Sequence, residues 1–108
     1  MLCLGVESTA HTFGCSIVDS DGKILSDARD VYKAPEGSGI HPRDASRHHI
    51  EHSSAVLNQA ISSAGLSIKD IHVIGYSAGP GLGPCLRVGA VVSRALAGYY
   101  GRVFDVMP

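Results

Sequence analysis

The apolar positions of this chain fall into short runs that glycine, proline and polar turns separate. Short apolar runs with such boundaries are typical of buried strands. They predict strands at residues 2–7, 14–19 and 23–32. The pair Asp21-Gly22, between the second and third strands, is a strong signal for a tight hairpin turn. We therefore expect an antiparallel meander of three strands.

A helical pattern follows the glycine- and proline-containing loop at residues 33–40. Pro42 suits the first position of a helix, where its missing N–H removes no hydrogen bond. Apolar residues then recur on one helical face, and Gly65 has the place of a C-terminal cap; these apolar residues are Ile50, Leu57, Ile61 and Ala64. The pattern predicts a helix over residues 42–64.

The rest of the chain alternates between strand and helix patterns. An apolar run at 71–77 predicts a strand, 84–99 a second helix, and 103–106 a last strand, with Gly101-Arg102 as the turn before it. The order is β-β-β-α-β-α-β. A meander followed by two right-handed crossovers defines an α/β half-domain of the ribonuclease H-like class, in which the last two strands run parallel to the first.

A glycine-rich loop connects the strand at 71–77 to the second helix, and residues 79–84 read Gly-Pro-Gly-Leu-Gly-Pro. Glycine lets the backbone approach a ligand closely, and the first turn of a helix directs free N–H groups at negative charge. The loop matches neither the phosphate loop that ends in Gly-Lys-Ser/Thr nor the GxGxxG fingerprint. It predicts an anion site of another kind, at Gly79, Pro80, Gly81 and Gly83.

Polar residues also follow the first strand, where Glu7, Ser8 and Thr9 form the start of a turn. In a ribonuclease H-like fold, this turn faces the ligand cleft at the carboxyl end of the strand. Hydroxyls and turn amides can contact a phosphate, and a carboxylate can hold Mg²⁺ through water. The alternative is an ordinary strand end and turn.

Three histidines on the first helix raise the question of a metal. His48 and His52 are four residues apart on one helical face, but the order His-His-Ile-Glu-His is not HExxH, and no third ligand is evident nearby. Packing or interface roles are therefore favoured for His48, His49 and His52. Arg87, in the first turn of the second helix, has three open roles: an anion contact, a partner contact or simple solvation.

Composition narrows the class of protein. The chain has 108 residues, 44% hydrophobic and 18% charged, which suits one globular domain. Its net charge of −1 gives no basic signature of nucleic-acid binding. The three cysteines lack CxxC spacing and are expected to be reduced and structural. No signal peptide or membrane-spanning run is evident, so we expect a cytoplasmic protein.

The second helix is apolar nearly all round, so more than one of its sides is expected to be covered. The same chain or a partner could cover it.

Taken together, three segments resemble one family: residues 4–9 (LGVEST), 42–49 (PRDASRHH) and 77–89 (SAGPGLGPCLRVG). It is the tRNA threonylcarbamoyladenosine synthase family, bacterial TsaD and its archaeal and eukaryotic counterpart in the KEOPS complex. The paired histidines are more similar to the archaeal and eukaryotic branch.

The resemblance implies a two-lobed enzyme with the actin-like, sugar-kinase-like ATPase fold, of which residues 1–108 would be the N-terminal lobe. Such enzymes transfer a threonylcarbamoyl group from threonylcarbamoyl-adenylate to N6 of the adenosine next to the tRNA anticodon. They use ATP-derived adenylate and one metal ion, iron or zinc. Because the family's metal histidines follow the fifth strand and its last ligand lies in the second lobe, no metal ligand and no activity are expected in residues 1–108 alone.

The family's partners are tRNA, a small dimerising subunit, a kinase-like ATPase and a further small subunit. On this chain, the resemblance assigns the nucleotide side to Glu7, Ser8, Thr9 and the glycine loop. It assigns a partner surface on the two helices, with the residues His49, His52, Val56, Arg87, Val91 and Arg94.

One departure concerns the first turn, where bacterial relatives carry two acids and this chain has His11 and Thr12. Two other interpretations remain open. One is a non-catalytic scaffold paralogue, similar to TsaB, that binds a catalytic partner through its helices; the other is part of a sugar or acetate kinase. Residues 82–85 (LGPC) favour the catalytic branch, and no Ser/His/Asp arrangement supports the protease activity formerly assigned to the family.

Overall fold

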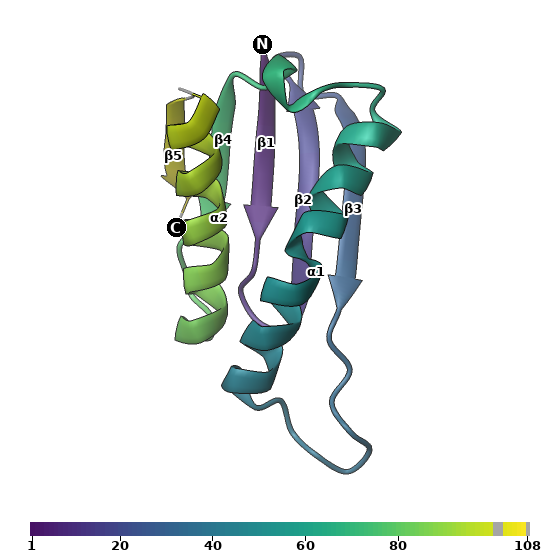
Figure 1. The fold of residues 1–108 in the computed structure, drawn as a ribbon, viewed down its shortest axis with the longest axis vertical. Coiled ribbons are helices and arrows are strands. Elements are labelled where there is room, and N and C mark those ends of the chain that lie inside the picture. Colours follow the sequence, from purple (N-terminus) through teal and green to yellow (C-terminus); the bar gives the residue numbers. More distant parts are fainter. Residues whose placement is uncertain (101–102, 108) are drawn as a thin grey trace.

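Figure 1 shows the computed structural model, which describes residues 1–100 and 103–107. In these residues, five strands form one sheet, and two α-helices and one short 3₁₀ helix complete the fold. The strands are β1 (Leu2–Glu7), β2 (Thr12–Asp19), β3 (Ile24–Val31), β4 (Val73–Ser77) and β5 (Val103–Met107). The helices are α1 (Pro42–Ser63), the short 3₁₀ helix η1 (Ile68–Asp70) and α2 (Gly83–Tyr100). The turn expected at Gly101-Arg102 lies outside the described residues.

The sheet has the order β3-β2-β1-β4-β5. The pairs β1–β2 and β2–β3 are antiparallel, so the predicted meander is confirmed. The pairs β1–β4 and β4–β5 are parallel, as two crossover connections require. Leu4 is the centre of this register, since it pairs with Ile17 on one side and with Ile74 on the other.

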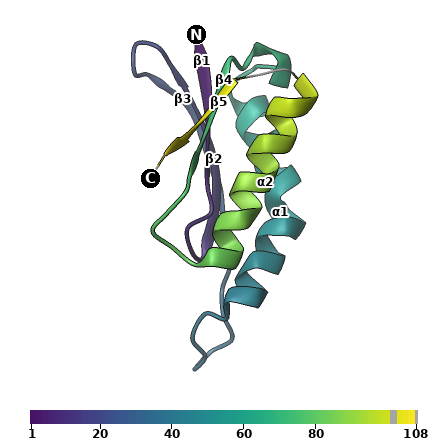
Figure 2. The ribbon, with the colours of Figure 1, turned by 90° about the vertical axis from the view of Figure 1, so that its left-hand side faces the viewer.

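Both helices lie on the same face of the sheet, as Figure 2 shows when the sheet is seen edge-on. Alternate strand residues point into the layer between sheet and helices, where Leu4, Phe13 and Ile17 have no exposed surface. Val56 and Ala60 of α1 and Ala97 of α2 complete this core. Burial raises the pKa of the Cys15 thiol to about 12, so this free cysteine is a neutral core residue.

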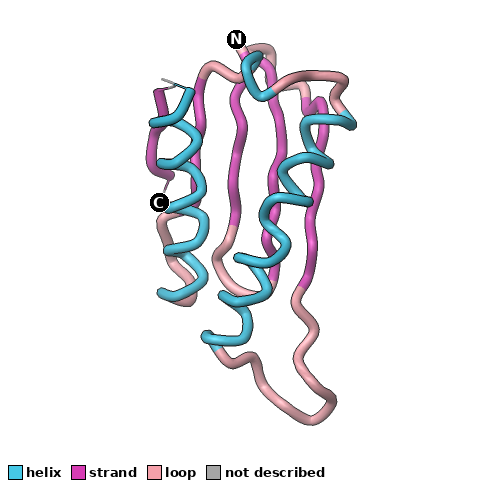
Figure 3. Tube along the Cα trace, in the orientation of Figure 1, coloured by secondary structure: helices cyan, strands magenta, loops and turns pink. Residues whose placement is uncertain are grey.

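The local signals at the ends of α1 act as the sequence indicates. The helix begins at Pro42, and Gly65 follows it with a φ of +69°, a left-handed conformation that glycine adopts without a steric penalty. Ser67 and Asp70 form a capping box around η1. Figure 3 shows the long loop between β3 and α1, which extends beyond the end of the sheet.

Several expected boundaries need small corrections. β2 begins at Thr12 rather than Gly14, because Thr12 and Phe13 still pair with β3. β4 begins at Val73 rather than Ile71, because Ile71 is the C-cap of η1 and pairing with β1 begins at Val73. α2 begins at Gly83, which makes Pro84 its second residue rather than its first.

The sheet face opposite the helices stays open in the described part of the chain. Small and polar residues line a shallow trough of about 490 Å³ there, among them Cys3, Gly5, Ser16, Asp27 and Ser77. No helix of the described residues is both long and apolar enough to span a lipid bilayer.

Candidate functional site

The turn after β1 and the glycine loop after β4 meet at one edge of the sheet. Parallel pairing places the carboxyl ends of β1 and β4 side by side, and both segments leave the sheet there (Figure 1). One hydrogen bond joins them directly, because the Leu82 amide donates to the carbonyl oxygen of Thr9 over 2.7 Å. Ligands of open α/β sheets bind at this kind of edge.

The contact between the two segments explains the glycine at position 81. A Cβ atom there would overlap the carbonyl oxygen of Thr9, so any larger residue must push the loop away from the turn. Gly83 differs, because a Cβ atom at that position would meet nothing. The fold of the chain without a ligand therefore already requires glycine at position 81. At position 83 the fold would accept a larger residue, and glycine leaves open space beside the start of α2.

Two backbone N–H groups in the first turn of α2 have no carbonyl oxygen within the helix to which they can donate. Of the four N–H positions at the start of the helix, Leu82 already donates to Thr9 and Pro84 has no hydrogen. Gly83 and Cys85 remain. Because Gly83 is exposed, its amide is accessible to an anion at the end of the sheet.

The side chains on the expected nucleotide side divide into exposed and buried ones. Glu7 is exposed, and its carboxylate accepts a hydrogen bond from the Thr9 hydroxyl over 3.2 Å. Gly79 is half-buried, and Pro80 is exposed. Since a carboxylate repels a phosphate, Glu7 can act beside one only through a bridging cation or water.

The expectation that Ser8 faces a nucleotide is wrong for its side chain. Ser8 is fully buried, and its hydroxyl oxygen accepts a hydrogen bond from the Gly89 amide over 3.1 Å. A Cβ atom on Gly89 would collide with that hydroxyl. Ser8 therefore fastens α2 to the turn after β1 and so fixes the position of the glycine loop.

A second site lies between the two helices, where an apolar groove of about 410 Å³ is open to solvent. Ile50 of α1 and Val91 of α2 line it with exposed fractions of 64% and 65%. Arg87 also lines the groove, and Arg94 is exposed further along α2. Arg87 is thus an exposed residue of the groove and not a core residue.

Two residues expected on the partner surface do not belong to it. His49 and Val56 lie on the face of α1 that packs on the sheet, and they are 0% and 3% exposed. Amphipathic helices bury the residues on their core-facing stripe, and His49 and Val56 are seven residues apart, so they share that stripe. His52 is half-buried and lies beside Asp30 of β3.

The structure places a third side chain that can bind a metal beside two of the histidines, and spacing along the chain did not reveal it. Asp30, near the end of β3, lies beside His48 and His52 of α1. It is eighteen residues before His48, on another element, so spacing along the chain gives no sign of it. Only the packing of α1 across β2 and β3 brings these side chains together.

Fold and site together define an α/β half-domain of the actin-like, ribonuclease H-like class, with a glycine loop at the carboxyl edge of its sheet. Solved structures share this arrangement. YeaZ from Pseudomonas aeruginosa superimposes with a TM-score of 0.78 over 99% of this chain and 44% of its own, at 15% sequence identity. At that identity the likeness concerns the fold alone.

Sequence comparisons identify the family. The family model of TsaD, tRNA N6-adenosine threonylcarbamoyltransferase, matches residues 23–104. A protein of that name from Pyrobaculum islandicum is 57% identical over 90% of this chain, and one from Ignicoccus hospitalis is 51% identical over 93%. The chain therefore belongs to the tRNA N6-adenosine threonylcarbamoyltransferase family. It spans 29% and 30% of the length of these two relatives.

Proposed function

We propose that this chain is the N-terminal lobe of an enzyme that transfers a threonylcarbamoyl group from threonylcarbamoyl-adenylate to N6 of an adenosine in tRNA, next to the anticodon. The observation that carries the proposal is the exposed glycine loop, held against the turn after β1 by the Leu82–Thr9 hydrogen bond. Membership of the family supplies the reaction, and the loop supplies a place for the adenylate.

In this proposal, the backbone of Gly79, Pro80, Gly81 and Gly83 lies along the nucleotide, and the free amide of Gly83 at the start of α2 faces its phosphate. The Thr9 hydroxyl donates to the same group after it turns away from Glu7, which accepts its hydrogen in the free chain. Glu7 acts through a hydrated cation, because a bare carboxylate would repel the anion. A helix start contributes only about 0.3–1 kcal/mol to such binding, so the second lobe has to provide most of the affinity.

The iron or zinc that the resemblance implies does not fit the described residues of this edge. Glu7 is the one carboxylate among the residues proposed here, and a metal of this kind needs three protein ligands or more. We therefore derive no step of the reaction through that metal.

A graft tests the proposed function. The corresponding N-terminal part of the Pyrobaculum islandicum relative is replaced by this chain, and threonylcarbamoyl incorporation into tRNA is measured with the remaining subunits of the complex. We expect the chimera to retain activity within about tenfold of the ungrafted enzyme, because about half of the grafted residues are identical. A folded chimera that binds its partners but transfers nothing would favour the scaffold interpretation instead.

We also propose that the groove between α1 and α2 binds the small dimerising subunit of a KEOPS-type assembly in the cytoplasm, which would join the lobe to the kinase-like ATPase and to tRNA. The support is its exposed apolar lining, Ile50 and Val91, with Arg87 in the same lining and Arg94 exposed further along α2. Unpaired apolar surface rimmed by charge is typical of interaction sites.

Charge in this groove is expected to prevent assembly. Ile50→Glu and Val91→Glu should each weaken binding of the small subunit at least about tenfold, because a carboxylate would be desolvated in an apolar contact. The free energy of unfolding of each free variant should stay within about 0.5 kcal/mol of that of the unchanged chain, since both positions are exposed. Co-elution in gel filtration measures the complex. Gln59→Glu, exposed on α1 outside the groove lining, is the matched control; equal complex formation by all variants would contradict the assignment.

A further inference from the structure

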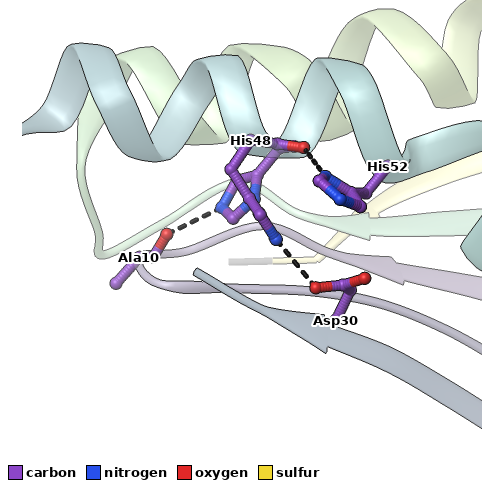
Figure 4. A network of polar contacts seen from close by, with 5 residues as sticks. Ala10, Asp30, His48 and His52 are labelled. Atoms are coloured by element: carbon purple, nitrogen blue, oxygen red, sulfur yellow. Dashed lines mark hydrogen bonds and ion pairs between the residues drawn. The ribbon is translucent and has the colours of Figure 1, made fainter. Parts of the chain in front are cut away.

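A cluster of metal-ligating side chains lies away from the glycine loop, where α1 crosses the end of β3. One ring nitrogen each from His48 and His52 and a carboxylate oxygen of Asp30 all lie within 4.8 Å of one another. Figure 4 shows the three side chains converging between the helix and the strand. Among the described residues, this is the one group of three such side chains with this spacing.

The hydrogen bonds around the cluster determine which nitrogen atoms carry protons. The carbonyl oxygen of Ala10 can only accept, so the Nε2 atom of His49, at 2.7 Å, must donate. His49 is fully buried, and burial disfavours a charged ring, so we place its single ring proton on Nε2 and take its Nδ1 atom as an acceptor. The Nδ1 atom of His48, 2.9 Å from it, must therefore be the donor of that contact.

With one ring proton of His48 on Nδ1, its Nε2 atom offers a lone pair unless a second proton or a cation binds there. That lone pair faces the Oδ1 atom of Asp30 at 2.8 Å, so two acceptors lie opposite each other. Such an arrangement is stable only with a positive species between the two atoms, either a proton on His48 or a metal cation.

His52 has the same orientation of its protons. Its Nδ1 atom lies 2.8 Å from the carbonyl oxygen of His48, so it donates there, and the Nε2 atom is the ring nitrogen left to bind a cation. The rings of His48 and His52 stack with centroids 4.3 Å apart. Two imidazolium rings in this arrangement would repel each other, whereas two neutral rings can share one cation.

We propose that Asp30, His48 and His52 bind one zinc-type transition-metal dication, with a fourth position open to solvent. Two imidazoles and one carboxylate are a donor set that suits zinc and its neighbours. Bonds of about 2.0–2.1 Å around a tetrahedral ion place ligand atoms about 3.3 Å apart. The separations here, from 2.8 Å to at most 4.8 Å, bracket that value, so small side-chain rotations complete the site.

The surroundings agree with a cation site. His49 orients the His48 ring from behind, as hydrogen-bonded partners of metal-binding histidines do. An open hollow of about 330 Å³ beside the two histidines gives access from solvent, and its other lining residues are Tyr32, Asp44, Arg47 and Glu51. The two carboxylates there favour a cation, and the single guanidinium opposes it. The proposal is independent of the transferase function.

Titration of the 108-residue chain with Co²⁺ tests the site, because a tetrahedral cobalt centre absorbs in the visible range. We expect one bound Co²⁺ per chain, displaced by Zn²⁺. His52→Ala and Asp30→Asn should each lower the Co²⁺ affinity at least about tenfold, since each removes one ligand. Far-UV circular dichroism checks that the variants fold; both side chains are only half-buried, which makes these changes tolerable. His41→Ala, an exposed histidine without a side-chain cap hydrogen bond, is the matched control and should bind as the unchanged chain does.

Two results would overturn the proposal. If the folded chain takes up no Co²⁺ or Zn²⁺ at millimolar concentration, a proton rather than a metal bridges His48 and Asp30. If His52→Ala and Asp30→Asn bind Co²⁺ as tightly as the His41→Ala control does, the metal occupies other residues.

Discussion

Replacing Gly81 with alanine is expected to lower adenylate affinity in the chimeric enzyme at least about tenfold, which corresponds to about 1.4 kcal/mol. The new Cβ atom would overlap the carbonyl oxygen of Thr9, so the loop has to move away from the turn and the Leu82–Thr9 hydrogen bond is lost. Binding of the small subunit should persist, because the groove between α1 and α2 lies outside this contact. Equilibrium binding of threonylcarbamoyl-adenylate, or of a stable analogue, measures the effect.

Gly83→Val separates a collision with the ligand from damage to the loop. A Cβ atom at Gly83 meets nothing in the free chain, so the thermal stability of this variant should change little. If the nucleotide lies where we propose, the valine side chain still blocks it and affinity falls. Unchanged adenylate affinity in both Gly81→Ala and Gly83→Val would reduce the loop to a connector.

Gly89→Ala is expected to destabilise the fold by about 1–3 kcal/mol, the usual range for overpacking of a tight contact. Its Cβ atom would collide with the buried hydroxyl of Ser8 and break the hydrogen bond that holds α2 to the turn after β1. For a chain of this size, each kcal/mol lowers the melting temperature by about 4–8 °C. Thermal unfolding followed by circular dichroism measures the shift.

Gly98→Ala in the same helix is the matched control. Gly98 is exposed, and a Cβ atom there would meet nothing. Alanine should therefore stabilise the chain by roughly 0.5–1 kcal/mol, because glycine loses more backbone entropy when a helix forms. If Gly89→Ala also stabilised the chain, the Ser8–Gly89 contact would not be part of the folded state.

The order of elements follows from the sequence because each element has local signals. Short apolar runs bounded by turn residues mark the strands, the Asp21-Gly22 pair marks a hairpin, and Pro42 and Gly65 mark the ends of α1. Local signals have a precision of a few residues, and the structure moves the starts of β2, β4 and α2 by one or two positions. Pairing with β3 and the intervening η1 decide two of these boundaries.

The candidate sites, like the elements, have some features with local sequence signals and others that depend on packing. The glycine loop could be predicted at residues 79–84 because the conformational preferences of glycine and proline belong to the residue types and can be read from the sequence. Contacts between distant residues have no such local sign. The burial of Ser8 against Gly89 and the burial of His49 against the sheet both depend on how a helix packs on strands.

The sequence by itself determined the class of fold, the family and the loop that marks the carboxyl edge of the sheet, since periodicity, turn residues and motifs act within short stretches of chain. Tertiary structure alone decided which of these residues are exposed and which meet. The carbonyl oxygen of Thr9 leaves no space for a side chain at Gly81. Ser8 and His49 are buried rather than exposed. Asp30 lies beside His48 and His52. The physical reason is that steric exclusion, burial and hydrogen-bond direction depend on neighbours in space, which the order of residues does not state.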